Sequence, residues 1–217
     1  MGSSFLHALV GSQLYPITDR HLSGLSHVEQ VAQLSDCGTT LIQLREKIDP
    51  PSQFYADAEI ALRVARERGV KIIINDRVDI ALALDADGVH LGQEDLPPEA
   101  ARRILGDKAI IGFSTHNIEQ VRLASQMSID YVAIGPIFAT ATKPSSNPAV
   151  GLEGLENIRR AVGDLPLVAI GGITSENFKM VLQAGADAVS VISDIWVPMG
   201  VTTTKIRGFL NAASNPG

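Results

Sequence analysis

Short apolar runs alternate with amphipathic segments along the whole chain. The runs are rich in Ile, Val and Leu, and several are apolar at almost every position. Such runs are typical of strands in a parallel sheet that helices cover. We therefore expect eight strands, at 14–18, 40–45, 71–75, 88–91, 109–113, 131–135, 167–171 and 188–192.

The segments between these runs have the spacing of surface helices. HVEQVAQLSDCG (27–38) places its apolar side chains on one stripe and ends at Gly38. PSQFYADAEIALRVARERG (51–69) has Pro near its start, charged residues on its polar face and Gly69 at its end. SENFKMVLQAG (175–185) predicts a helix that a serine caps and that Gly185 ends.

The order of these elements predicts a single-domain α/β protein with a (β/α)₈ TIM-barrel fold. ALDADGVHL and QAGADAVSV share one layout, in which a helix end and a small-residue turn lead into a buried strand. Eight such units within 217 residues suit a closed barrel. A doubly wound sheet is the alternative, but the regular units without a break in composition favour closure. We expect 1–12 to be an N-terminal extension and 212–217 a flexible tail.

Composition narrows the class of protein. Hydrophobic residues make up 45% and charged residues 19%, which is ordinary for a soluble globular protein. The net charge of −6 argues against nucleic-acid binding. The single cysteine, Cys37, excludes a disulfide framework and fits a reducing compartment. No apolar run reaches the roughly 18 residues of a membrane span. We expect a cytoplasmic protein that acts on neither membranes nor nucleic acids.

Polar residues follow nearly every expected strand. In barrels of this kind the active site lies at the carboxyl ends of the strands, so these residues are the candidates for chemistry. They are Gln43, Arg45, Lys47, Asn75, Asp76, His90, Gln93, Asp95, Ser114, Thr115, His116, Thr140, Thr142, Lys143, Gly171, Gly172 and Ser193.

The segment QLREK predicts an anion-binding clamp. Side chains alternate along a strand, so Gln43, Arg45 and Lys47 share one face. Arg offers a planar fork and Lys a point charge, and both suit phosphate oxygens. The alternative is a solvated strand end, because so short a motif is not specific.

Asp76 and Asp95 end consecutive units of the expected barrel, where they can converge. Two carboxylates are hard oxygen ligands that suit Mg²⁺ when water and substrate phosphate complete its shell. The alternative is that each aspartate caps the helix that follows it. Asp79, inside a helix, is expected to pair with Arg77 or with solvent.

Two later segments predict a second phosphate site. GGITSEN is a glycine turn that leads into a helix N-terminus, where free N–H groups bind phosphate, and the Ile192 and Ser193 amides could add to it. A tight turn without a ligand is the alternative. In the long connection 136–150, Lys143 could reach a phosphate, form a Schiff base or remain a solvated loop lysine.

The remaining candidates indicate the type of reaction. His90 lies on an apolar strand and reads as a core residue, whereas His116 is better placed for function. No pair of nucleophile and base is visible. This favours chemistry driven by a leaving group, in which a metal and cations stabilise departing diphosphate.

Seven motifs, taken in order, resemble those of the thiamine-phosphate synthase (thiamine-phosphate pyrophosphorylase) family. They are QLREK, INDRVDIAL, DADGVHLGQEDLP, IGFSTHN, YVAIGPIFATATK, VGLEGL and VAIGGI, and the match runs from LYPITD to VISDI. The resemblance implies a (β/α)₈ transferase that uses Mg²⁺. Such an enzyme joins 4-amino-2-methyl-5-hydroxymethylpyrimidine diphosphate to 4-methyl-5-(2-phosphoethyl)thiazole, giving thiamine phosphate and diphosphate. A homodimer is also a family expectation.

The resemblance also implies roles for individual residues. Gln43, Arg45, Lys47 and Asn75 look like the site for the pyrimidine diphosphate, and Asp76 and Asp95 look like the Mg²⁺ ligands. Ser114 resembles a serine near the pyrimidine, and Lys143 a lysine on the diphosphate. Arg45, Lys47, Ser114 and Lys143 would thus form the catalytic group. The thiazole-phosphate contacts look like Thr140, Thr142, Gly172, Ile192 and Ser193.

The same resemblance implies a mechanism without a base. The pyrimidine diphosphate ionises to a methylene cation, and the thiazole nitrogen captures it with its lone pair. One departure is Asp194, which stands where the family commonly has a small residue, and we expect it to add negative charge near a phosphate. The sequence does not decide which of Gly171 and Gly172 makes the phosphate contact.

Three other readings compete with this one. A thiazole tautomerase on the same barrel would use His116 for proton transfer and would need no metal. A phosphate-handling aldolase would use Lys143. A non-catalytic regulator would bind thiamine precursors without turning them over.

Overall fold

The computed structural model describes residues 9, 11–140 and 147–213, with side chains as far as 211. Eight parallel strands form one sheet in the order β1-β8-β7-β6-β5-β4-β3-β2. Their bounds are β1 Leu14–Pro16, β2 Leu41–Leu44, β3 Lys71–Asn75, β4 Gly88–Leu91, β5 Ile110–Thr115, β6 Tyr131–Ile134, β7 Leu167–Ile170 and β8 Ala188–Val191. Each of the eight expected strands is confirmed: 71–75 and 88–91 match at both ends, and the ends of the others shift by at most two residues.

The first and last strands in this order meet and close the sheet. Ile17, just after β1, bridges to Gln43 of β2 in the parallel sense. The Thr18 N–H donates to the Gln43 carbonyl at 2.9 Å. The sheet is therefore a (β/α)₈ barrel, and the doubly wound alternative is wrong.

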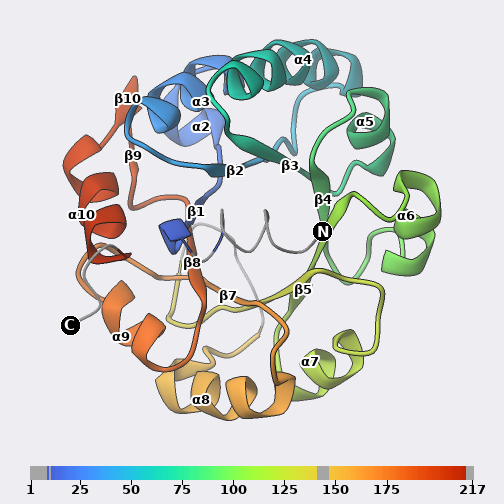
Figure 1. The fold of residues 1–217 in the computed structure, drawn as a ribbon. Coiled ribbons are helices and arrows are strands. Elements are labelled where there is room, and N and C mark those ends of the chain that lie inside the picture. The colour runs from blue at the N-terminus through green and yellow to red at the C-terminus, as the bar shows by residue number, and fades with distance from the viewer. Residues whose placement is uncertain (1–8, 10, 141–146, 214–217) are drawn as a thin grey trace.

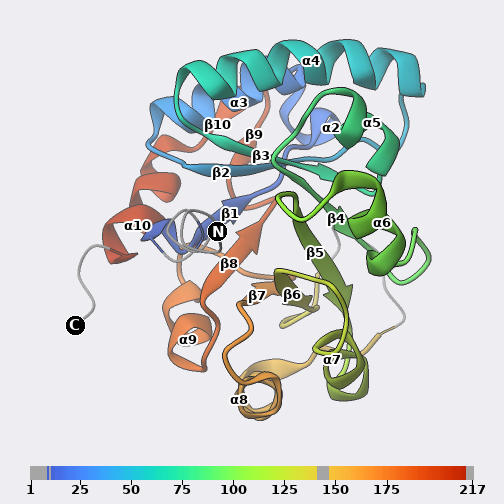
Figure 2. The same cartoon turned by 45° about the vertical axis from the view of Figure 1, so that its right-hand side comes forward.

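Helices form a ring outside the barrel (Figure 1). Their bounds are α2 Arg20–Ser23, α3 His27–Asp36, α4 Pro51–Glu67, α5 Val78–Ala83, α6 Pro98–Leu105, α7 Ile118–Ala124, α8 Gly151–Val162, α9 Phe178–Gln183 and α10 Thr203–Ala213. Between β8 and α10 lies a small hairpin of β9 Trp196–Val197 and β10 Gly200–Val201. Figure 2 shows α3 and α4 side by side along one flank. None of the helices in the described ranges is long and apolar enough to cross a membrane.

Local sequence signals explain where several helices begin. A capping box starts α3, because the Ser26 side chain accepts from the Glu29 N–H while the Glu29 carboxylate accepts from the Ser26 N–H. Pro51 occupies the first turn of α4, where its missing N–H costs nothing. The predicted serine cap of α9 is wrong. Asn177 stands at that N-cap, because residues 175–177 form a turn before the helix begins.

The barrel has two apolar layers. The larger one lies between the strands and the helices and contains most of the buried Ile, Leu and Val side chains. The smaller one fills the inside of the barrel, because alternate strand residues point inward. Its members are Leu9, Tyr15, Leu41, Ile73, Ile110, Tyr131, Ala133, Val168 and Ala188. The interior is therefore packed rather than open, and a site can form only above this layer.

A glycine in β5 makes room for a large side chain inside the barrel. A Cβ at Gly112 would lie 2.0 Å from Cζ of Tyr131, a distance no real contact reaches. Gly112 thus lets the phenol of Tyr131 reach the barrel axis, where the side chain is fully buried. The close approach fixes how β5 and β6 pack.

Candidate active site

A cavity of about 340 Å³ opens at the carboxyl ends of the strands. All eight strands, or the turns that follow them, contribute to its wall. Of the seventeen candidate residues that follow the expected strands, eleven line this cavity, together with Ile192. The eleven are Gln43, Arg45, Asn75, His90, Ser114, Thr115, His116, Thr140, Gly171, Gly172 and Ser193.

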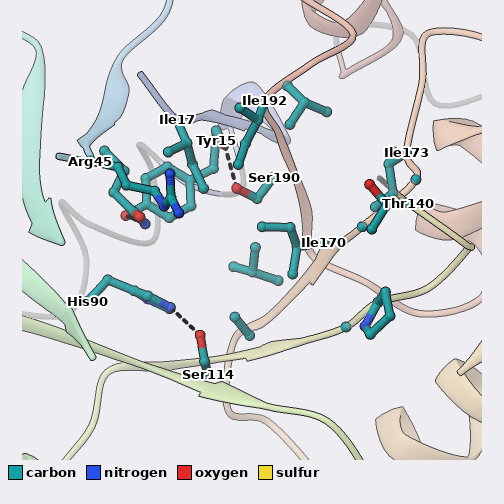
Figure 3. Close-up of a pocket in the computed structure, with 18 of the residues that line it drawn as sticks. Tyr15, Ile17, Arg45, His90, Ser114, Thr140, Ile170, Ile173, Ser190 and Ile192 are labelled. Carbon is teal, nitrogen blue, oxygen red and sulfur yellow. Dashed lines mark hydrogen bonds between the residues drawn. The ribbon is translucent and has the colours of Figure 1, made fainter. Parts of the chain in front are cut away.

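The cavity has two polar ends and an apolar wall between them. Arg45 lies on one side and Thr140 on the opposite side, and Ile170 lies between them (Figure 3). Ala133 and Val168 also line the wall. Such a cavity suits an elongated ligand with an anionic group at one end.

Buried polar side chains lie at the Arg45 end of the cavity, where a bound ligand can complete their hydrogen bonds. The Gln43 side chain is 2% exposed and donates from Nε2 to the Tyr15 hydroxyl at 3.0 Å. Asn75 is 7% exposed, and its Nδ2 has no hydrogen-bond partner among the described residues. A buried donor without a partner costs free energy, so Asn75 is poised to bind an acceptor brought by a ligand.

A charged cluster lies beside this end, outside the cavity lining. The ammonium of Lys47 pairs with the carboxylate of Asp76. Asp95 Oδ2 accepts from the Gly92 N–H at 2.6 Å. Burial raises the pKa of Asp95, and the neighbouring Asp76 raises it further while Lys47 opposes the change. The structure thus brings the two predicted carboxylates together, near enough to repel each other.

Helix capping does not explain these two aspartates. The residues at the N-caps of α5 and α6 are Arg77 and Pro97, and neither helix has a side-chain cap hydrogen bond. Asp76 itself has a φ of 62°, a backbone conformation that costs a non-glycine residue free energy. The capping alternative is therefore wrong, whereas the expected pair of Asp79 with Arg77 is confirmed.

Carboxylates are too few here for a site built only from protein. Within residues 9, 11–140 and 147–211, no group of three or more His, Cys, Asp or Glu side chains is placed to hold a metal ion. Asp76 and Asp95 offer two carboxylates. Mg²⁺ commonly uses one or two carboxylates together with water and substrate phosphate, so the pair fits such an ion.

The opposite end is built on two glycines after β7. Gly171 and Gly172 have φ angles of 99° and 66°, which favour glycine. A Cβ on Gly172 would lie 2.7 Å from the Cβ of Phe138, and one on Gly171 would lie 2.6 Å from the Cβ of Pro136. The turn therefore packs directly against the chain that follows β6, and both glycines line the cavity.

The helix after this turn does not offer the free amides that the sequence predicts. The Thr174 N–H donates to Asn177 Oδ1 at 2.8 Å, and the Ser175 N–H donates to Asp194 Oδ2 at 3.0 Å. Side chains of the protein thus occupy these donors. The Thr174 and Ser175 N–H groups are therefore not available to a phosphate.

Asp194 has a different environment from the one expected. Its Oδ1 accepts from the ammonium of Lys205 in α10 at 2.6 Å, and its side chain is 10% exposed. Lys205 therefore offsets the negative charge that Asp194 was expected to add near a phosphate. Asp194 ties the end of β8 to α10 and to the turn before α9.

Two predicted residues cannot be placed. Thr142 and Lys143 lie outside the described residues. His116 lines the cavity, and its Nδ1 donates to the Gly135 carbonyl at 2.7 Å.

Sequence reasoning missed a buried polar chain below the cavity. The hydroxyl groups of Tyr15 and Tyr131 are 3.0 Å apart. The Tyr131 hydroxyl is 2.8 Å from His90 Nδ1, and His90 Nε2 is 2.8 Å from Ser114 Oγ. His90 is a satisfied buried residue, as expected, but it also lines the cavity. A tyrosine on an apolar strand looks like a core residue, so the strand pattern gave no signal for this arrangement.

The fold and the site define a class of protein, a (β/α)₈ barrel with a small-molecule site at the carboxyl ends of its strands. A family model described as thiamine monophosphate synthase matches residues 14–195. The thiamine-phosphate synthase of Syntrophomonas wolfei is 48% identical over 181 residues, which cover 83% of this chain and 86% of that one. The counterpart from Chloroflexus aurantiacus is 44% identical, with 89% of each chain covered.

A solved structure agrees with the sequence comparisons. Thiamine phosphate pyrophosphorylase from Pyrococcus furiosus superposes with a TM-score of 0.83 at 36% identity, covering 94% of this chain and 96% of that chain. The chain belongs to the thiamine-phosphate synthase family and is an enzyme of the transferase class.

Proposed function

We propose that the protein condenses 4-amino-2-methyl-5-hydroxymethylpyrimidine diphosphate with 4-methyl-5-(2-phosphoethyl)thiazole. The products are thiamine phosphate and diphosphate, and Mg²⁺ assists the reaction. One observation carries the proposal: a single cavity has Arg45 and the Asp76–Asp95 pair at or beside one end and the glycine turn after β7 at the other. Two phosphorylated substrates can then bind with their anionic groups apart and their rings between.

The pyrimidine ring suits the buried amides near Arg45. Gln43 uses Nε2 on Tyr15, which leaves its carbonyl oxygen for the amino group of the pyrimidine. The Nδ2 of Asn75 is a donor without a partner among the described residues, and it suits an oxygen of the diphosphate. Ser114 reaches the same space from β5.

The diphosphate suits the cations at this end. Arg45 lines the cavity, and its Nη1 lies 3.7 Å from Asp19 Oδ2, a distance too long for a firm hydrogen bond. The guanidinium therefore keeps donors for phosphate oxygens. Lys47, which pairs with Asp76, would also contact the diphosphate. Lys143 would approach the diphosphate from the loop after β6.

Asp76 and Asp95 would hold Mg²⁺. The repulsion between the two carboxylates is the observation that favours a cation there, because it raises the pKa of Asp95 beyond the effect of burial. When bound, Mg²⁺ would neutralise charge that develops on the departing diphosphate. The remaining ligands would be water and phosphate oxygens.

The thiazole phosphate suits the opposite end. Gly172, Ile192, Ser193 and Thr140 surround it, and Thr142 would join them. Asp194 adds little repulsion, because Lys205 pairs with it. The ring would then lie along Ile170, with its nitrogen toward the pyrimidine.

No side chain needs to act as a base in this reaction. The bond between the methylene carbon and the diphosphate oxygen breaks, and the electron pair leaves with the diphosphate. The thiazole nitrogen then donates its lone pair to the methylene cation. The protein's contribution is orientation, exclusion of water and stabilisation of the leaving group.

A fluorescence assay tests the proposal. Purified protein is mixed with both substrates and Mg²⁺, and thiamine phosphate is oxidised to thiochrome. We expect product that a chelator abolishes, and a loss of at least about a hundredfold in the Asp95→Asn variant. Asp79→Asn is the matched control, because Asp79 lies on the surface, where it pairs with Arg77. Full activity of Asp95→Asn would refute the metal site.

The same assay separates the competing functions. Folded protein that binds thiazole phosphate but makes no thiamine phosphate would favour a regulator, or a tautomerase that uses His116. Trapping of a carbonyl substrate on Lys143 by borohydride would instead favour an aldolase.

A further inference from the structure

Four side chains in and beneath the cavity wall join the two halves of the site proposed for the pyrimidine. They run from Gln43 in β2 through Tyr15 and Tyr131 to His90, which reaches Ser114 in β5. Each step is 2.8–3.0 Å long. We name Tyr15, Tyr131 and His90 the tyrosine–histidine chain. Figure 3 shows its last step, from His90 to Ser114.

We propose that the tyrosine–histidine chain is a positioning device that fixes the direction of the Ser114 hydroxyl proton. The inference deepens the proposed function, because Ser114 belongs to the site proposed for the pyrimidine diphosphate.

Proton counting favours one direction, in which the protons of both tyrosine hydroxyls are used within the chain. The Gln43 amide N–H can only donate, so the Tyr15 oxygen accepts from it. The single proton of the Tyr15 hydroxyl is then available to the Tyr131 oxygen. The proton of the Tyr131 hydroxyl is in turn available to His90 Nδ1.

The end of the chain lies in the cavity wall. With Nδ1 accepting, neutral His90 carries its proton on Nε2 and donates to Ser114 Oγ. The Ser114 proton therefore turns away from His90 and toward the cavity. Ser114 is thus held as a donor to an acceptor atom of the pyrimidine diphosphate, and it is not held as a nucleophile that His90 deprotonates.

Packing keeps the chain in place. Tyr15, Tyr131 and His90 are 1%, 0% and 8% exposed. The ring of His90 stacks on Tyr131, with centroids 5.5 Å apart, and Tyr131 meets Tyr15 edge to face at 5.9 Å. Burial raises the pKa of both tyrosines far above the ordinary value, so both hydroxyls keep their protons.

The first test reads the histidine directly. Two-bond ¹H–¹⁵N spectra of ¹⁵N-histidine-labelled protein report which ring nitrogen carries the proton, and the His90→Gln variant assigns the signal. We expect the Nε2–H form in the unaltered protein and a mixture of forms in Tyr131→Phe. An Nδ1–H form in the unaltered protein would overturn the proposal.

The control is Tyr55, the remaining tyrosine of the protein. Tyr55 lies in α4, packed outside the barrel, so Tyr55→Phe removes a hydroxyl without touching the tyrosine–histidine chain. We expect its His90 spectrum to match that of the unaltered protein. A spectrum altered as much as that of Tyr131→Phe would show that the tautomer does not depend on the chain.

The second test reads turnover. Tyr131→Phe should lower kcat about tenfold, the value of one well-oriented hydrogen bond. The KM for the thiazole phosphate should stay unchanged, because that substrate binds at the other end. A kcat equal to that of Tyr55→Phe would contradict the proposal.

Two replacements of His90 sharpen this test. A Gln amide can place an N–H near the position of Nε2, whereas an Asn amide is too short and mimics Nδ1. We expect His90→Gln to retain more activity than His90→Asn, and the reverse order would contradict the proposal. The spectra need no substrate, so the chain can be judged even if the protein makes no thiamine phosphate.

Discussion

His27 is a fully buried histidine that does not line the cavity. Its Nδ1 is 2.8 Å from Thr18 Oγ1, and its Nε2 is 3.6 Å from Glu46 Oε2. Thr18 Oγ1 in turn accepts from the Arg45 N–H at 3.1 Å. The buried imidazole of His27 thus contacts Thr18, which binds the backbone of Arg45, and lies beside the carboxylate of Glu46.

Burial lowers the pKa of His27, although the charges of Asp57 and Glu46 oppose the change. Because the pKa of His27 is lower in the folded protein than in the unfolded chain, protonation of His27 favours the unfolded state. Stability contributed by neutral His27 is therefore complete above the unfolded pKa of about 6.5 and declines as the pH falls toward the folded pKa.

We expect the free energy of unfolding to fall by up to about 1.4 kcal/mol per pH unit below pH ~6.5, and by less in His27→Gln. Urea unfolding at several pH values measures both slopes. His21→Gln is the control, because His21 is exposed. Equal slopes in the unaltered protein and His27→Gln would show that His27 does not titrate with folding.

At the scale of elements, two glycines differ in the space that is available for a Cβ. Gly112 in β5 faces the ring of Tyr131 in β6 and has no room for a Cβ. Gly208 in α10 is exposed, and nothing lies within 4 Å of its would-be Cβ. Gly112→Ala should lower the free energy of unfolding by about 1–3 kcal/mol, whereas Gly208→Ala should raise it by about 0.5–1 kcal/mol. Thermal unfolding measures both, and effects of the same sign would refute this view of the packing.

The ion pair between Asp194 and Lys205 connects the end of β8 to α10. In the Lys205→Met variant, the carboxylate of Asp194 loses its cationic partner beside the end of the cavity proposed for the thiazole phosphate. We expect the KM for the thiazole phosphate to rise roughly fivefold, which corresponds to about 1 kcal/mol of repulsion. Steady-state kinetics measure the change. The double variant Lys205→Met with Asp194→Asn should recover the original KM, and no recovery would contradict the electrostatic explanation.

At the scale of the whole molecule, the sequence predicted the strands well because both faces of each strand are buried. A strand with helices outside and packed side chains inside is apolar at nearly every position, and this pattern is visible without a structure. The carboxyl-end rule then led to Gln43, Asn75 and Ser114, because polar residues after such strands stand out. The metal ligands and the substrates stay predictions.

The rest depended on contacts that no spacing encodes. Tyr15 and Tyr131 are 116 residues apart, and each looks like an ordinary core residue. Lys205 reaches Asp194 across the β9–β10 hairpin, so no helical or strand period links them. Ser175 resembles a cap, yet its N–H is bound by Asp194. Sequence patterns do not predict the residue pairs that form when the barrel closes.

We propose that one cavity holds two phosphorylated substrates and joins them. A single reaction in which diphosphate and thiamine phosphate are both quantified, with each substrate omitted in turn, tests this proposal. We expect equal amounts of the two products, and neither product when either substrate is absent. Diphosphate released without thiamine phosphate, from the pyrimidine substrate alone, would contradict it.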